Sequence, residues 1–186
     1  MGSQLAQQQL DLSKQWLEDV VIGLNLCPFA KPVIKAKTIR YALSQATEFD
    51  ELLTFFCAEL ASISAADERV IATTIVVLPA SLGDFYDYLD FLAACEAKLQ
   101  ERALEGVLQL ASFHPLYLFA GVEADDISHY TNRSPYPMIH IIREAQMSRV
   151  LDKHPNSDAI PERNIELLKD IGKDGLVKIF PPFANY

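Results

Sequence analysis

The stretch from Arg69 to Leu78, RVIATTIVVL, limits the possible folds of this chain more than any other. Nearly all of its side chains are apolar or β-branched, and Pro79 follows directly. A strand that is covered on both faces has such a continuous run, whereas a strand with one face in water alternates apolar and polar residues. The stretch therefore predicts a central strand that is buried on both faces.

Strand and helix patterns alternate along the first 113 residues. Apolar residues at helical spacing mark the helices, and alternating or β-branched stretches mark the strands. The predicted helices span residues 12–25, 47–63 and 84–104, and the other predicted strands span residues 38–43 and 107–113. This alternation implies crossover connections. We predict an α/β fold, or α+β sandwich, with a small, mainly parallel sheet of three or more strands and helices packed on it.

Beyond Phe113 the chain is predicted to be irregular as far as Tyr136 and then helical. A proline in the first turn suits a helix over residues 137–151, because the N–H that proline lacks would be unpaired there. A last helix is predicted from Pro161 to Gly172. The aromatic tail, IFPPFANY, is expected to pack on the rest of the chain.

Composition indicates a single globular domain over residues 1–186 in the cytoplasm. Half of the residues are apolar, which is enough for a substantial core. The chain has no run of eighteen apolar residues and no apolar leader, so neither a membrane span nor export is predicted. Cys27, Cys57 and Cys95 lie far apart without a CxxC pair, which predicts thiols rather than disulfides.

Charge and motif content narrow the partners and cofactors. The net charge is −9 and no basic stripe carries interleaved aromatic residues, so nucleic acid is not expected as a partner. Neither GxGxxG nor GxxxxGK[ST] occurs, so NAD and ATP sites of those kinds are not indicated and the cofactor stays unknown. A homo-oligomer stays open, because an apolar helix face packs equally well inside or on a second copy.

The histidines gather in one part of the chain, between His114 and His154. His114 directly follows the predicted strand 107–113. Ligands bind beyond the carboxyl ends of parallel strands, and an imidazole there can act as an acid or base near neutral pH. The alternative is that His114 bonds a loop carbonyl and holds the turn before Pro115, and the sequence does not choose between the two.

The segment TNRSPYP, residues 131–137, predicts an anion site in front of the next helix. Helix N-termini attract anions, and an arginine adds a bidentate donor. The predicted substrate-binding residues here are Asn132, Arg133, Ser134 and Tyr136. The alternative is structural: Ser134 caps the helix, the prolines stiffen the turn, and Arg133 pairs with an acidic side chain.

On a helix over residues 137–151, the side chains of His140, Arg143 and Glu144 share one face. Glu144 lies four residues after His140, where its carboxylate can hold the ring and raise its pKa. We therefore predict a catalytic role for His140 and substrate contacts for Arg143 and Glu144. A solvated helix face has the same pattern, so that alternative stays open.

Cys27, in LNLCPFAKP, is the predicted nucleophile. At the end of a helix it meets the negative end of the dipole, which disfavours the thiolate, so it needs a nearby imidazole. Without one, Cys27 is a small apolar side chain in the core. Cys27, His114 and His140 match no short-range pattern of metal ligands, and no metal is predicted.

Five segments, spread over nearly the whole chain, are similar to those of a known family. The segments are WLEDVVIGLNLCPFAKPV, LPASLGDFYDYLDFL, LQLASFHPLYLFAG, YTNRSPYPMIHIIREA and IPERNIELL. They resemble a bacterial family, the domain of unknown function 1415. The resemblance implies a bacterial, cytosolic protein and no particular activity. The family's recurring CPFA, FHP and NRSPYP blocks coincide with the residues singled out above, which favours one shared site.

The sequence supports three functional hypotheses. The first is an enzyme, a hydrolase or transferase, that holds a small carboxylate or phosphate with Arg133 and Arg143. In it the histidines act as acid or base and Cys27 as nucleophile. The second is a module that binds a small anion without turnover. The third is a protein that meets a partner through its acidic helices or its aromatic tail.

Overall fold

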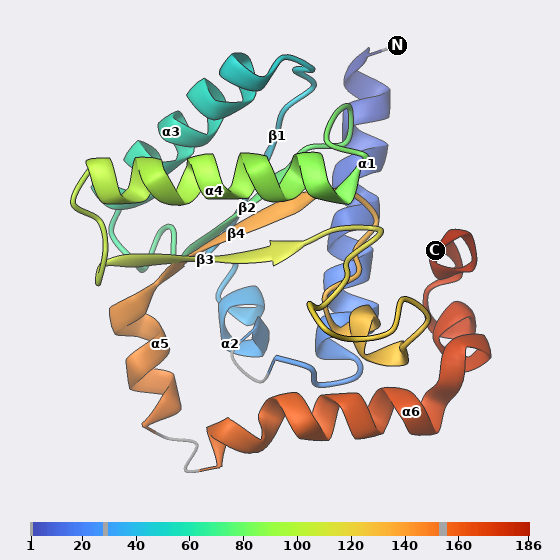
Figure 1. Cartoon of the computed structure of the whole chain (residues 1–186). Coiled ribbons are helices and arrows are strands. Elements are labelled where there is room, and N and C mark those ends of the chain that lie inside the picture. The colour runs from blue at the N-terminus through green and yellow to red at the C-terminus, as the bar shows by residue number, and fades with distance from the viewer. Residues whose placement is uncertain (1, 28–29, 153–155) are drawn as a thin grey trace.

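The computed structural model describes residues 2–27, 30–152 and 156–186, and its centre is a four-stranded sheet (Figure 1). The strands are β1 (Ile39–Leu43), β2 (Thr73–Val77), β3 (Leu108–Phe113) and β4 (Met138–Arg143). The α-helices are α1 (Gly2–Trp16), α2 (Ala30–Lys35), α3 (Phe49–Ala65), α4 (Phe85–Glu101), α5 (Glu144–Leu151) and α6 (Ile160–Ile179). The π-helix η1 (Leu17–Ile22) continues α1, and the 3-10 helices are η2 (Ile127–Thr131), η3 (Ser157–Ala159) and η4 (Pro181–Asn185). The predicted α/β class, with helices packed on a small sheet, is confirmed.

The strand order β1-β2-β4-β3 makes the sheet mixed. β1 and β2 pair in parallel, whereas β4 is antiparallel to both of its neighbours, β2 and β3. β1, β2 and β3 therefore run in the same direction, and their carboxyl ends lie at one edge of the sheet. The prediction of a mainly parallel sheet is wrong because β4, which runs the other way, lies between β2 and β3.

The prediction of a helix over residues 137–151 is wrong for its first half. Residues 138–143, MIHIIR, form β4, and α5 begins only at Glu144. A short apolar run fits a buried strand and a buried helix equally well, so the spacing alone does not decide. The neighbouring strands decide, because without β4 the facing edges of β2 and β3 would hold unpaired backbone groups inside the protein.

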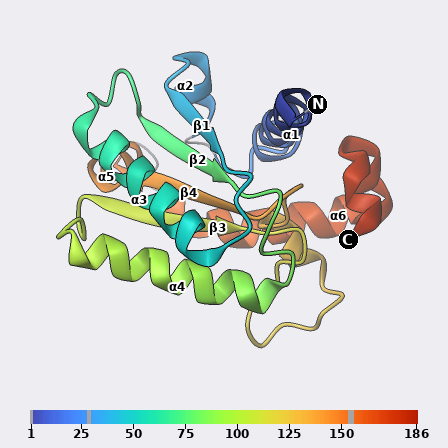
Figure 2. The same cartoon turned by 90° about the horizontal axis from the view of Figure 1, so that it is seen from above.

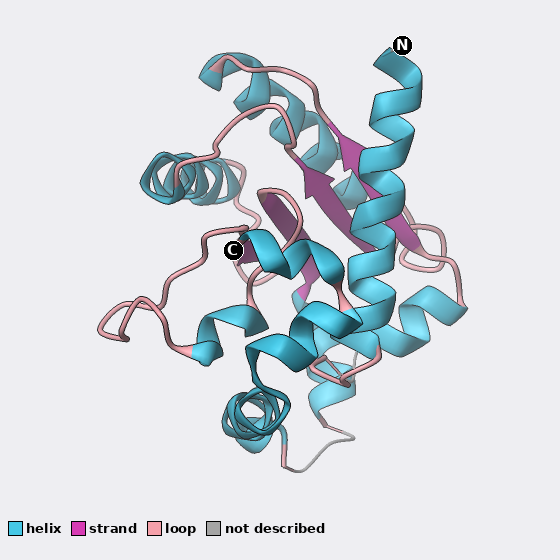
Figure 3. Cartoon of the chain, turned by 90° about the vertical axis from the view of Figure 1, so that its right-hand side faces the viewer, coloured by secondary structure: helices cyan, strands magenta, loops and turns pink. Residues whose placement is uncertain are grey.

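Helices cover both faces of the sheet (Figures 2 and 3). The strand side chains that face the α3 and α4 core include Val76, Ile139 and Ile141. Those that face the core under α1, η1 and the C-terminal segment include Ile75, Val77 and Met138. All five residues of β2 are buried, so the predicted central strand is confirmed. Each fully buried Leu, Ile or Phe stabilises the fold by about 2 kcal/mol relative to exposure.

α6 changes direction at Gly172, which is where the sequence predicted the last helix to end. Gly172 has a φ of 67°, a left-handed angle that glycine adopts without strain. The chain beyond it buries Phe180 and Phe183, and the Phe183 ring meets the Tyr130 ring of η2 at 5.1 Å. The prediction that the aromatic tail packs is confirmed. Neither α6 nor any other helix in the described part of the chain is long and apolar enough to cross a membrane.

The π-helix η1 sets the path of the chain toward Cys27. Its wide turn is closed by Gly23, whose N–H donates to the carbonyl of Glu18 at 2.9 Å, five residues back. This turn presses the Asp19 carbonyl against Gly23, and a Cβ there would lie 2.2 Å from that oxygen. Only glycine fits at position 23, because the Cβ of any other residue would clash with this carbonyl. The predicted helix over residues 12–25 corresponds to the end of α1 and to η1, and α1 itself begins earlier, at Gly2.

We expect Gly23→Ala to lower the free energy of unfolding by about 2 kcal/mol, because the clashing atom belongs to the backbone and cannot rotate away. Urea denaturation followed by circular dichroism measures the change. Gly83→Ala is the matched control, since nothing lies within 4 Å of a Cβ at Gly83. Equal stabilities of the two variants would contradict the role of the π-helical turn.

Candidate functional site

The predicted site residues lie in three separate regions. His114 and residues 132–136 lie at the sheet edge where β2 and β3 end, and Arg143 lies at the opposite edge, at the end of β4. Cys27 and His140 line one cavity on the sheet face opposite α3 and α4. Because side chains alternate along a strand, His140 and Arg143 point to opposite faces, so the shared helix face predicted for them is wrong.

His114 is fully buried and both of its ring nitrogens are bonded. Nδ1 accepts from the Leu116 N–H at 3.0 Å, so the proton is on Nε2, which donates to the Leu82 carbonyl at 2.8 Å. Burial lowers the pKa of His114, and the bond to Leu82 opposes this shift in part. The neutral ring thus ties the loop before α4 to the turn after β3, which is the structural alternative that the sequence allowed.

His129 holds the long loop before η2 in a similar way, by bonding backbone groups through both ring nitrogens. Its Nδ1 accepts from the Phe119 N–H at 3.1 Å, and its Nε2 donates to the Glu123 carbonyl at 2.8 Å. The ring is fully buried. His114 and His129 therefore both order loops through backbone groups. His154, the last histidine of the cluster, lies outside the described residues.

Residues 132–136 form a tight turn instead of a helix N-terminus. The Asn132 amide donates to the Ser112 carbonyl at 3.1 Å, which ties the turn to β3. Ser134 is fully buried, and its hydroxyl donates to the Tyr136 carbonyl at 2.6 Å, so it caps no helix. Burial raises the pKa of Tyr136. Arg133 lies on the Tyr130 ring, with Cζ 4.5 Å from the ring centroid.

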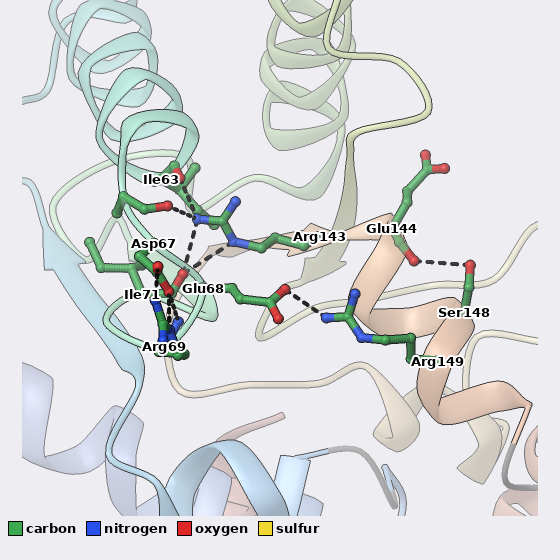
Figure 4. A network of polar contacts seen from close by, with 10 residues as sticks. Ile63, Asp67, Glu68, Arg69, Ile71, Arg143, Glu144, Ser148 and Arg149 are labelled. Carbon is green, nitrogen blue, oxygen red and sulfur yellow. Dashed lines mark hydrogen bonds and ion pairs between the residues drawn. The ribbon is translucent and has the colours of Figure 1, made fainter.

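Arg143 closes the C-terminal end of α3 (Figure 4). Its guanidinium donates to the carbonyls of Ile63 at 2.5 Å, Ala66 at 2.7 Å and Ile71 at 3.1 Å. The last carbonyls of a helix have no partner within the helix, and a cation there also meets the negative end of the dipole. The Glu144 carboxylate points away from Arg143 in Figure 4. Arg143 therefore joins β4 to α3 and the following loop.

Arg143→Met is expected to destabilise the fold by about 3 kcal/mol, because three carbonyls lose a charged donor that water cannot fully replace. Equilibrium unfolding in urea measures this loss. Arg149→Met removes the same charge from an exposed ion pair with Glu68, 2.6 Å long, and should cost less than about 1 kcal/mol. A loss for Arg143→Met as small as that of the control would rule out the anchoring role.

A cavity of about 170 Å³ lies on the face of the sheet beneath α2 and α5. Most of its wall is apolar, and the residues that bring polar or sulfur atoms to it are Cys27, Thr73, His140, Gln146 and Met147. Thr73 comes from β2 and His140 from β4, where they lie on the same face of adjacent strands. Thr73 was not predicted, since a threonine inside a β-branched run carries no signal of a site.

Hydrogen bonding fixes the proton of His140 on Nε2. The Thr73 hydroxyl donates its one proton to the Ile141 carbonyl at 2.7 Å, so it can only accept from His140 Nε2 at 2.5 Å. Nδ1 is then an acceptor and is the ring nitrogen left for a ligand in the cavity. Burial lowers the pKa of His140 to about 4. The ring is therefore neutral at physiological pH.

A second, larger cavity of about 580 Å³ adjoins the first. Both cavities have Cys27 and Phe113 in their walls. The larger one also reaches η2 and the start of α6, and its polar wall residues are Ser128, Thr131, Asn132 and Asn164. The Asn164 amide donates to the Leu26 carbonyl at 2.8 Å, which holds α6 against the segment before Cys27. We call the two cavities together the Cys27 cleft.

The chemistry available in the Cys27 cleft is limited. Of the predicted catalytic and binding residues, the cleft contains Cys27, His140 and Asn132, and neither Arg133 nor Arg143 is part of its wall. Within the described ranges, no group of three or more His, Cys, Asp or Glu residues could hold a metal ion. The cleft therefore offers mostly apolar walls, a thiol, one imidazole acceptor and a few hydroxyl and amide groups.

The lowered pKa of His140 predicts a loss of stability in acid. Its folded pKa of about 4 lies below the ordinary value of 6.5, so the folded state binds fewer protons than the unfolded state. The contribution of His140 is therefore complete above pH 6.5 and is lost as the pH falls toward 4. At about pH 5 the expected loss is about 2 kcal/mol.

Urea unfolding at about pH 7.5 and about pH 5 measures this loss in the wild type and in His140→Gln, which cannot titrate. The wild type should lose about 2 kcal/mol more than the variant. Equal losses would show that His140 titrates alike in the folded and unfolded chains. The subtraction cancels the contribution of His114, which is present in both proteins.

The fold and the cleft together define a class of protein: a mixed α/β sheet with helices on both faces and a ligand-sized cleft on one of them. The chain belongs to the family described as Protein of unknown function (DUF1415), whose model matches residues 8–178. The family resemblance seen in the sequence is confirmed. No match was found among the curated proteins or among the solved structures.

Proposed function

We propose that this protein binds a small, largely apolar and uncharged molecule in the Cys27 cleft. The observation that carries the proposal is the shared wall of the two cavities, Cys27 and Phe113, which makes them two lobes of one site. The larger lobe, about 580 Å³, lies within the range of small-molecule sites. Mostly apolar walls with a few polar groups that orient the ligand are typical of such sites.

The polar groups of the cleft specify the ligand further. His140 Nδ1 is a neutral acceptor, so a ligand that fills the smaller lobe should carry an O–H or N–H donor. A charged ligand would lose its hydration without gaining an opposite charge, since no arginine, lysine, aspartate or glutamate forms part of the described cleft wall. We therefore propose an uncharged ligand for this cleft in place of the small anion that the sequence suggested.

Catalysis by Cys27 with His140 as base is the second candidate, because both line the smaller lobe. The ordinary pKa of a thiol is about 8.5, whereas the pKa of His140 is about 4. Before any attraction between the ions, moving a proton from the thiol to the ring costs about 6 kcal/mol. We therefore prefer binding without turnover to catalysis as the function of the cleft.

Our proposal places the protein in the cytosol, where thiols stay reduced.

Phenol and anisole form a matched pair of probes for the proposal, since they have similar shapes and only phenol has a donor. We expect phenol to bind the wild type about fivefold more tightly than anisole, as one hydrogen bond of about 1 kcal/mol requires. Ligand-observed NMR titration measures both affinities. In His140→Phe, which has no acceptor, the preference should disappear.

Ala111→Leu tests the place of binding, because Ala111 lies in the wall of the smaller lobe. The larger side chain should fill the lobe and weaken both probes. Ala58→Leu on the exposed face of α3 is the matched control and should bind both probes like the wild type. Unchanged binding in Ala111→Leu would refute the assignment of the cleft as the site.

A further inference from the structure

Arg133 is a buried arginine in a fixed place. Only 8% of the residue is exposed. Its backbone is held on both sides, because its N–H donates to the His129 carbonyl at 3.1 Å and its carbonyl accepts from Trp16 Nε1 at 2.9 Å. Its guanidinium lies over the Tyr130 ring, with Cζ 4.5 Å from the centroid. The side chain is therefore positioned by α1 and η2 rather than free in solvent.

The guanidinium of Arg133 has no partner of opposite charge. Among the residues that the structure describes, no carboxylate forms an ion pair with it. Nε is sealed from solvent and makes no hydrogen bond. The two Nη nitrogens make no hydrogen bond to described residues either, but they are not sealed. The Nη donors of the guanidinium are therefore unused and, unlike Nε, are not fully enclosed.

Two other charges that the fold buries wholly or in part have partners. The buried Glu59 carboxylate accepts twice from Arg40, at 2.6 Å and 2.9 Å. Arg143 donates to three backbone carbonyls at the end of α3. A buried charge without such partners is costly, and arginine cannot escape the cost by losing its proton. Within the described residues, the Arg133 guanidinium thus lacks the hydrogen-bond partners that Glu59 and Arg143 have.

The shape of the guanidinium determines which ligand geometry fits. Its N–H donors point outward in the plane of the group. Two parallel N–H groups match two oxygens of a carboxylate or phosphate. Tyr130 itself is held, since its hydroxyl donates to the Tyr186 carbonyl at 3.2 Å and its ring meets Phe183. Tyr130 is therefore held in place, and the two Nη nitrogens of Arg133 remain without a hydrogen-bond partner among the described residues.

We propose that Arg133 is an oxyanion-binding residue that takes a carboxylate or phosphate group in the plane of its guanidinium. This site is distinct from the Cys27 cleft. The Asn132 side chain lies in the wall of the cleft and bonds to β3, whereas Arg133 is not part of the wall and stacks on Tyr130. The anionic partner that the TNRSPYP segment suggested is thus assigned to Arg133 alone.

The single tryptophan of the chain provides a direct readout. Trp16 donates to the Arg133 carbonyl, so anion binding should change its fluorescence emission. Inorganic phosphate is titrated at constant ionic strength, and acetate in a parallel series distinguishes a carboxylate from a phosphate site. We expect a saturable change with at least one of the two anions, together with a rise in the melting temperature.

Arg133→Met keeps the length of the buried stem and removes the charge. It should weaken binding of the active anion by about tenfold or more and abolish the rise in melting temperature. It should also be at least as stable as the wild type without anion, because an uncompensated charge is gone. Arg149→Met, which removes an exposed positive charge, is the control for net charge and should bind like the wild type.

Arg133→Lys carries the test if Arg133→Met does not fold. It keeps the charge and loses the two parallel donors, so the affinity should fall by about tenfold. The proposal is overturned if neither anion produces a saturable change in the wild type. It is also overturned if binding by the Arg133 variants equals that of Arg149→Met, which would mean a response to general charge.

Discussion

β4 is hydrogen-bonded along both sides, and the arrangement of both cores depends on its register. Its partners, Ile75 on β2 and Ala111 on β3, lie opposite His140. A slip of one residue would turn Ile139 and Ile141 out of the α3 core and move a histidine into it. Burying an imidazole among apolar side chains without its Thr73 partner is costly, so the pattern of β4 permits one register.

The same register locates the Cys27 cleft. On the face opposite α3 and α4, the core under α1 and η1 takes up Met138 and Ile75, toward the carboxyl ends of β2 and β3. The other half of that face, with Thr73, His140 and Ile142, is left to α2 and α5. These helices have 6 and 8 residues, which is too short to fill the space with interlocking side chains. The π-helix η1 ends five residues before Cys27, so that Cys27 lies where the two lobes meet.

The elements that could be predicted from the sequence are those whose conformation depends on residues nearby in the chain. The long helices were found because Asp84 accepts from the N–H groups of Tyr86 and Asp87 at the start of α4, and because Gly172 breaks α6, both within a few residues. β4 was missed because strand or helix was decided by β2 and β3, which lie far from it in sequence. Cys27 and His140, which the sequence placed in one shared site, do line one cavity, but His140 reaches it from a strand and not from the predicted helix. A histidine's sequence neighbours do not tell whether its ring nitrogens will find backbone partners.

Burial has opposite consequences for the histidines and for Arg133. A buried imidazole can lose its proton, as the lowered pKa of His114 and of His140 reflects, and the neutral ring then needs one donor and one acceptor. The fold supplies both to His114 and leaves only Nδ1 of His140 for a ligand. A guanidinium stays charged when buried, so its requirement can be met only by a partner. Arg143 finds carbonyls, whereas Arg133 finds only the face of Tyr130 within the described part of the chain. Arg133 is therefore the charged group, among those that the sequence grouped together, for which we propose a partner outside the chain.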